Sequence, residues 1–348
     1  MKDRGNCSSS VVDAPGASRR WHAAPAVTLL LLSPVMVDLL FGSIRITNPF
    51  ALLPAILGWG CGALIIHELV RRCGLGWPAI MLLGLSLAIV EECAILQTSL
   101  APLIGVDPDH VFGRRFGVNW PYFLWALGHE SALAVGVPIL LVELFYPERR
   151  NRPWLGSIGF ALCIVAFVLG AVFTWYGWTQ IYMPQYFPQS ALRVAPSLIG
   201  VALVVAAVLA VLALNSSSLA RQLSVVTAPR AWQVGAATLV VGTAWSALLF
   251  LAYGAASGLP AAIPLAVGVG VAATACTVVV RWTARSGWTS LHSLTLAFGA
   301  LAAAMLAGFP LLWVSGAGSV DYAGKLFLNV VAILALARLG LKLRPPSD

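Results

Sequence analysis

The chain has 348 residues, of which 59% are hydrophobic and only 10% are charged, and its mean hydropathy is +0.88. A soluble domain carries about 25% charged residues, so a chain this apolar cannot cover its surface in water. The net charge is +8, but the basic residues form no stripe, which argues against nucleic acid as a partner. We therefore expect an all-α, polytopic transmembrane helix bundle whose partners are membrane lipids.

The order of polar and apolar segments predicts a short tail and one membrane domain. Residues 1–22 are polar and rich in Ser, Gly and Ala, and we expect a disordered cytoplasmic tail there. Residues 23–348 are expected to form a single transmembrane domain. A span needs about 20 mainly apolar residues. Ten stretches qualify: 24–41, 49–70, 77–100, 120–146, 154–177, 194–214, 231–256, 258–280, 290–314 and 322–343.

The placement of the basic residues predicts the orientation. Cytoplasmic loops of membrane proteins are enriched in Lys and Arg. If the N-terminus is cytoplasmic, 16 of the 21 Lys and Arg residues fall on the inner side. The outer side then holds the other five, which are Arg45, Arg114, Arg115, Arg193 and Lys325. An even number of spans places both termini in the cytoplasm, and we expect the plasma membrane as the location.

The acidic residues divide the chain into two halves. None of the 13 Asp and Glu residues lies between Arg149 and Val320. Residues 23–153 are therefore expected to form a half that carries the polar site. Residues 154–348, rich in Ala, Val, Leu and Gly, are expected to form an apolar scaffold.

Two pairs of ionisable residues fall within predicted spans. Glu91 and Glu92 lie in the third span, about 12 Å below its outer end, and His129 and Glu130 lie in the fourth, about 13 Å below its outer end. Because consecutive spans are usually neighbours, we expect the pairs to meet in the outer half of the bilayer. Glu91 and Glu92 differ by about 100° around the helix, so only one of them can face His129.

Ionisable residues inside a membrane are costly and point to function. Glu91, Glu92, His129 and Glu130 are the candidate catalytic residues, with a carboxylate activating water and the imidazole as proton partner or oxyanion stabiliser. The substrate would be lipid-like or a peptide. A metal site is a further role, although no HExxH motif is present and neither a metal nor a cofactor is identified. The alternatives are a proton-coupled transporter or permease, and a non-catalytic accessory or immunity protein in which the cluster is a polar lock between helices.

Other polar residues are expected to have local roles. Asp38 lies near the outer end of the first span, where it faces either the same vestibule or the membrane interface. Asp321 and Lys325 are four residues apart and are expected to form a helical ion pair. The remaining expectations are ion pairs of His67, Glu68 and Glu143 with the arginines near them, and a turn at Asp107-Pro108-Asp109-His110.

The paired glutamates and the following histidine resemble motifs of the CPBP family, which includes CAAX prenyl endopeptidases and bacteriocin-processing membrane proteins. The family's first motif is EExxxR; Glu91 and Glu92 match the glutamates, and Leu96 stands in place of the Arg. Its second motif has an aromatic residue four positions before a histidine, as Trp125 and His129 do. A final histidine motif is missing. The resemblance implies that Glu91 or Glu92 activates water with assistance from His129.

Overall fold

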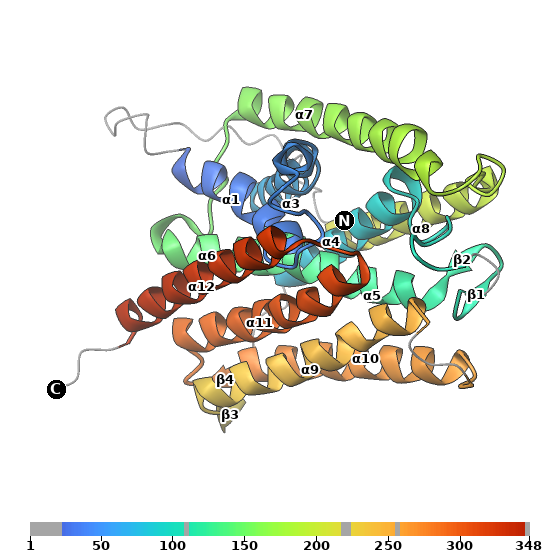
Figure 1. The fold of residues 1–348 in the computed structure, drawn as a ribbon. Helices are drawn as coiled ribbons and strands as arrows, with labels where there is room; N and C mark the ends of the chain where they lie inside the picture. The colour runs from blue at the N-terminus through green and yellow to red at the C-terminus, as the bar shows by residue number, and fades with distance from the viewer. Residues whose placement is uncertain (1–22, 108–110, 217–223, 255–257, 345–348) are drawn as a thin grey trace.

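The computed structural model describes residues 23–107, 111–216, 224–254 and 258–344, and they form an all-α bundle of long helices that run side by side (Figure 1). Nine helices within these ranges are long and apolar enough to cross a membrane. Their bounds are Pro49–Arg72, Trp77–Ile95, Trp120–Phe145, Ser157–Gln185, Pro196–Asn215, Ala231–Ala252, Ala262–Thr283, Ser290–Val314 and Ser319–Lys342. The expectations for residues 1–22 and for Asp109 and His110 lie outside the described ranges.

The first predicted span is shorter than expected. It forms the apolar helix Ala24–Leu39, which consists of α1 (Ala24–Pro34) and the π-helical η2 (Val35–Leu39). Sixteen helical residues extend about 24 Å, which is less than the roughly 30 Å of a bilayer core. The chain leaves the helix after Leu39 and reaches the next one through residues 40–48.

Each of the first four predicted spans contains a π-helical segment. The second span is built from η3 (Pro49–Ala51), α2 (Leu52–Ala55), η4 (Ile56–Gly60) and α3 (Cys61–Arg72). The third joins α4 (Trp77–Val90) to η5 (Glu91–Ile95), and the fourth joins α5 (Trp120–Glu130), η7 (Ser131–Gly136) and α6 (Val137–Phe145). The π-helical segments among these are η4, η5 and η7. Such segments are rare and are frequently found at functional sites.

The later spans are more regular, except that the fifth contains the π-helical segment η9 (Tyr176–Tyr182). They are α7 (Ser157–Trp175) with η9 and η10 (Met183–Gln185), α8 (Pro196–Asn215), α9 (Ala231–Ala252), α10 (Ala262–Thr283), α11 (Ser290–Val314) and α12 (Ser319–Lys342). The short helix η8 (Pro147–Arg149) follows the fourth span. Two short sheets connect helix ends: β1 (Arg114–Arg115) pairs antiparallel with β2 (Val118–Asn119), and β3 (Ser224–Thr227) pairs parallel with β4 (Arg285–Ser286).

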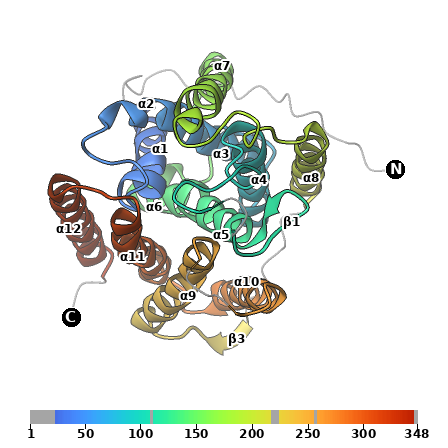
Figure 2. The same ribbon diagram turned by 45° about the vertical axis from the view of Figure 1, so that its right-hand side comes forward.

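The early spans occupy the centre of the bundle. In Figure 2, α1, α3, α4, α5 and α6 lie together, with α7, α8, α10 and α12 around them. Burial follows this arrangement: 78% of the most apolar stretch of Trp120–Phe145 is buried, against 6% for Ala262–Thr283. The spans that carry Glu91, Glu92 and Glu130 are therefore surrounded by protein, while the outer helices present apolar faces to lipid.

Two prolines free backbone carbonyls in the core, and each carbonyl has a close neighbour. Proline has no N–H, so Pro138 cannot donate to Ala134 O as a helical residue would. The buried Ser33 hydroxyl donates to that oxygen instead, at 2.6 Å. Pro34 likewise leaves Leu30 O without its helical N–H donor. Gly60 packs so close to this oxygen that a Cβ on Gly60 would lie 2.2 Å from it.

Candidate functional site

Three of the four candidate residues are buried carboxyls gathered where the π-helical segments meet. Glu91 and Glu92 are the first residues of η5, and their exposed fractions are 4% and 1%. Glu130 ends α5 directly before η7 and is 6% exposed. Glu91 lies against η4, where a Cβ on Gly58 would be 3.9 Å from Glu91 Oε1. The expectation that the third and fourth spans are neighbours is confirmed, since α4 packs on both α5 and η7.

Glu92 and Glu130 interact directly. Their carboxyl groups lie close enough to interact electrostatically, and one oxygen of Glu130, Oε2, is buried and has no hydrogen-bond partner among the described residues. Because two ionised carboxylates repel each other at such a buried site, we expect one of them to hold a proton. The other charges that act on Glu130 come from Glu91 and Asp38 and are also acidic. The site is thus a cluster of four carboxyls (Asp38, Glu91, Glu92 and Glu130), called the carboxyl cluster below.

Hydroxyl groups hold Glu92 in place. The fully buried Ser99 donates to Glu92 Oε2 at 2.7 Å, and Tyr122 donates to Glu92 Oε1 at 3.4 Å. Tyr253, just beyond the end of α9, lies close enough to Glu92 to interact with its charge. Burial raises the pKa of the Tyr253 phenol to about 12, and the Glu92 charge adds to the shift. The phenol therefore stays protonated at physiological pH.

A compact segment between the third and fourth spans fixes Ser99. The buried Asn119 side-chain amide donates to Thr98 O at 3.0 Å and to Ala101 O at 2.7 Å, and its backbone N–H donates to Ser99 O at 2.8 Å. Arg114 donates to Asn119 Oδ1 and to the Leu100 and Ala101 carbonyls. Burial lowers the pKa of the Arg114 guanidinium. This segment closes one end of the site with hydrogen bonds to the backbone around Ser99.

His129 does not join the carboxyl cluster. Its Nε2 lies 3.3 Å from Val37 O, and because a carbonyl only accepts, Nε2 carries the proton. The ring stacks on Trp125 with centroids 4.6 Å apart and packs on Phe41 at 4.4 Å. His129 and Glu130 differ by about 100° around the helix, so only one of them can face Glu92, and it is Glu130. The expected His129 partnership with Glu91 or Glu92 is therefore absent from this structure.

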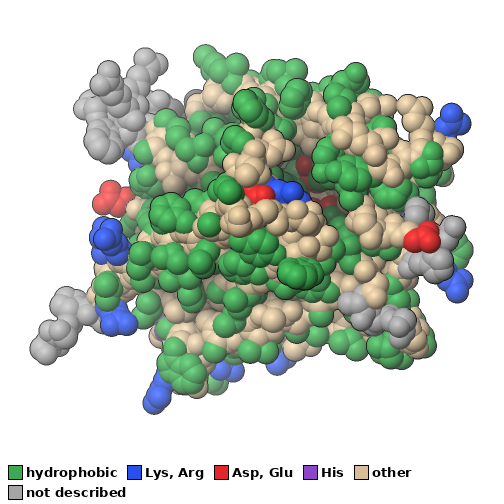
Figure 3. Space-filling view, viewed as in Figure 1, with side chains coloured by type: hydrophobic (Ala, Val, Ile, Leu, Met, Phe, Trp, Pro, Cys, Tyr) green, Lys and Arg blue, Asp and Glu red, His purple; other side chains and the backbone are tan. Residues whose placement is uncertain are grey.

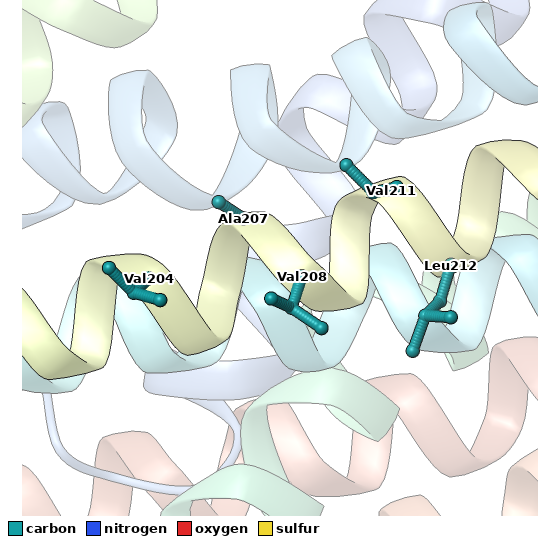
Figure 4. A pocket seen from close by; sticks show the side chains of 5 residues that line it. All are labelled: Val204, Ala207, Val208, Val211 and Leu212. Atoms are coloured by element: carbon teal, nitrogen blue, oxygen red, sulfur yellow. The ribbon is translucent and has the colours of Figure 1, made fainter.

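The side of the bundle that Figure 3 shows is hollowed in the middle. Acidic and basic side chains are visible in a recess that is surrounded by apolar ones, and the helices run across this view rather than along it. The recess therefore opens sideways. A separate open pocket, shown in Figure 4, lies along α8 and is lined by the apolar residues Val204, Ala207, Val208, Val211 and Leu212.

A second polar cluster at the other end of the same core is built from ion pairs. Arg71 binds Glu143, and Arg72 Nη2 lies 3.4 Å from Glu68 Oε2. His67 is fully buried and stacks on Trp154 at 3.5 Å, while Glu68 accepts a hydrogen bond from Trp154 N. The expectation of ion pairing for Glu68 and Glu143 is confirmed. Because each carboxylate is paired with an arginine, we assign this cluster a structural role.

Several contacts of the site could not be assigned from the sequence. Ser99 and Tyr122 are not conspicuous residues, although Ser99 follows Glu92 by seven positions, and Tyr122 precedes His129 by the same interval. The sequence leaves two alternatives for the Asp38 side chain, the vestibule or the membrane interface. Its electrostatic interaction with Glu91 and Glu130 favours the vestibule. In the described residues no group of three His, Cys, Asp or Glu side chains has a geometry that could hold a metal ion.

No family model, no curated protein and no solved structure matches this chain.

Proposed function

We propose that the carboxyl cluster is an acid–base site that hydrolyses a lipid-like substrate within the bilayer. The observation that carries the proposal is the close approach of two buried carboxyls, Glu92 and Glu130, the second of which has an oxygen without a hydrogen-bond partner among the described residues. Two carboxyls that share one proton supply a general base and a general acid at the same place. Ser99 and Tyr122 keep Glu92 oriented, which such a pair requires.

The hydrolytic step balances within this pair. The ionised carboxylate takes a proton from a water molecule, whose oxygen attacks the carbonyl carbon of an ester or amide. The bond from that carbon to the leaving oxygen or nitrogen breaks, and the protonated carboxyl gives its proton to the leaving group. The pair holds one proton before and after the step, with the two roles exchanged. Water is the only co-reactant.

The recess supports a substrate that arrives from the membrane. It opens on the side of the bundle, where acyl chains would lie, and polar groups are visible inside it (Figure 3). The motif resemblance to the CPBP endopeptidases points in the same direction for Glu91 and Glu92. The resemblance does not extend to His129, whose Nε2–H donates a hydrogen bond to Val37 O.

A proton-coupled transporter is the second candidate. The cluster contains four carboxyls, two more than hydrolysis uses, and Asp38 and Glu91 act electrostatically on the pair. Groups of carboxyls inside membranes are typical of proton relays. The concentration of acidic residues in the first four spans and at the start of the last one fits less well with the repeated halves of many transporters.

One reconstitution separates these functions. The protein is placed in vesicles of phosphatidylethanolamine and phosphatidylglycerol that contain a pH-sensitive dye, and the lipids are analysed by mass spectrometry. We expect lysolipid and fatty acid from the wild type and from the control Glu148→Gln, whose side chain is exposed, and neither product from Glu92→Gln or Glu130→Gln. Lipids left intact, with a change of internal pH that depends on Glu92, would favour transport. Cleavage of an added membrane-spanning peptide alone would replace lipid with peptide as the substrate.

A further inference from the structure

Lys325 is a buried cation in an otherwise peripheral helix. Only 22% of the most apolar stretch of α12 is buried, whereas Lys325 is 2% exposed. The expected helical ion pair with Asp321 is wrong. Asp321 Oδ1 accepts hydrogen bonds from Thr47, at 2.8 Å from the hydroxyl and 3.2 Å from the backbone N–H, and Lys325 turns toward the core.

The ammonium group of Lys325 binds the two backbone carbonyls that directly follow the first helix. Nζ donates to Leu40 O at 2.5 Å and to Phe41 O at 2.9 Å. The last carbonyls of a helix have no partner within it, and no water replaces that partner inside a bilayer. A positive charge also suits the C-terminal end of a helix. Lys325 thus supplies hydrogen-bond donors to the carbonyls at the point where the first helix ends early.

Two glycines leave room for this contact. A Cβ on Gly308 of α11 would collide with Phe41 O and would lie 2.6 Å from Lys325 Nζ. Gly42 has a φ of +100°, and a Cβ there would lie 3.2 Å from Lys325 Cδ. The Phe309 ring covers the ammonium, with its centroid 4.9 Å from Nζ. A larger side chain at either glycine would separate α12 from the first helix.

The residues next to these carbonyls include Asp38 of the carboxyl cluster and two that contact the neighbouring His129. Asp38 lies two positions before Leu40 and acts on Glu91 and Glu130, Val37 O binds His129, and the Phe41 ring packs on His129. We propose that Lys325 is a positioning residue that fixes the end of the first helix, and through it Asp38, in the carboxyl cluster. The contact itself does not depend on the proposed function; only its importance for chemistry does.

Hydrogen exchange in nanodiscs tests the contact. In Lys325→Met, which keeps the length of the side chain but removes the charge, we expect the amides of Leu40 and Gly42 to exchange about tenfold faster or more. These amides are bound to Val35 O and Asp38 O in the wild type. Lys342→Met, at the exposed other end of α12, serves as the matched control and should exchange as the wild type does. Wild-type protection in Lys325→Met would overturn the proposal.

Two further measurements separate positioning from general folding. Lys325→Arg keeps the donors and should restore most of the protection; equal loss in both variants would contradict the proposed role of the donors. If Lys325→Met is not recovered folded, solid-state NMR of the wild type with 15N-labelled Lys and 13C-labelled Phe carbonyls should detect one contact between a Lys nitrogen and a carbonyl carbon shorter than about 4 Å, because the N···O distance of a hydrogen bond is about 2.9 Å and the carbon lies one C=O bond further away. The absence of that contact overturns the proposal.

The pH profile of carboxyl modification reports on the site. A hydrophobic carbodiimide reacts with protonated carboxyls, and its reaction at Glu130 should follow a different pH profile in Lys325→Met because Asp38 has moved. An unchanged profile would show that Lys325 does not position the site. If wild-type Glu92 and Glu130 do not react at all, the proposed function fails, while the hydrogen exchange still decides the role of Lys325.

Discussion

Ser99 is fully buried and donates a hydrogen bond of 2.7 Å to Glu92 Oε2. Hydrogen bonds to charged groups contribute about 1.5–3 kcal/mol, so Ser99→Ala should lower the free energy of unfolding by about that amount. Tyr122→Phe should cost less, because its 3.4 Å distance is close to the limit for a hydrogen bond. Unfolding in mixed micelles measures both. A greater loss in Tyr122→Phe would contradict the assignment of Ser99 as the main support.

His129 is held by two aromatic rings and a carbonyl, which predicts a structural role. Aromatic pairs contribute about 0.5–1.5 kcal/mol each beyond burial, so His129→Ala should lower the unfolding free energy by a few kcal/mol. His129→Phe keeps a ring between Trp125 and Phe41 and should retain most of the activity in the reconstitution. Loss of activity in a stably folded His129→Phe would return His129 to the catalytic set.

The helix of the fourth span is interrupted next to Pro138, and the hydrogen bond that compensates for this interruption can be tested. Pro138 leaves Ala134 O without its helical donor, and Ser33 supplies one. Ser33→Ala should therefore cost about 1–3 kcal/mol of unfolding free energy in the wild type. In Pro138→Ala the restored N–H can bind the carbonyl, so the same change should cost much less. A double-mutant cycle of unfolding measurements gives the coupling, and strictly additive costs would refute this account of η7.

The spans were largely predictable from the sequence, and their ends less so. Hydropathy places nine of the ten predicted spans on long helices within the described ranges. It fails at the first, because the apolar run continues to Phe41 while the helix ends at Leu39 and a side chain from α12 binds the carbonyls beyond it. It also ends the fifth span early: the predicted span ends at residue 177, whereas helical structure continues to Gln185.

The carboxyl cluster was only partly predictable, for a geometric reason. Depth along a helix follows from residue number, so Glu92 and the pair His129-Glu130 could be placed at the same level. Rotation about the helix was not fixed, because π-helical segments change the number of residues per turn next to each of these residues. The sequence therefore identified the level of the site but not that Glu130, rather than His129, faces Glu92.

At the scale of the molecule, the segments with many basic residues lie at one end of the bundle. In Figure 1 the end of α6, the β3–β4 sheet and the end of α12 lie toward the left, and β1 and β2 toward the right. The positive-inside rule then predicts that the left end is cytoplasmic. Reporter fusions after residues 75, 150 and 285 should report the cytoplasm, and those near 110 and 185 the exterior. One robust reversal would refute the predicted orientation.

The central claim is that Glu92 and Glu130 share a proton at a site that is reached from the bilayer. Dicyclohexylcarbodiimide, which dissolves in lipid and reacts with protonated carboxyls, tests this directly in nanodiscs at neutral pH. Peptide mapping by mass spectrometry should place one label per chain on Glu92 or Glu130. Either Glu92→Gln or Glu130→Gln should remove most of the labelling, and a water-soluble carbodiimide should modify only exposed carboxyls such as Glu148. An unlabelled pair, or a pair labelled only by the water-soluble reagent, would contradict the account.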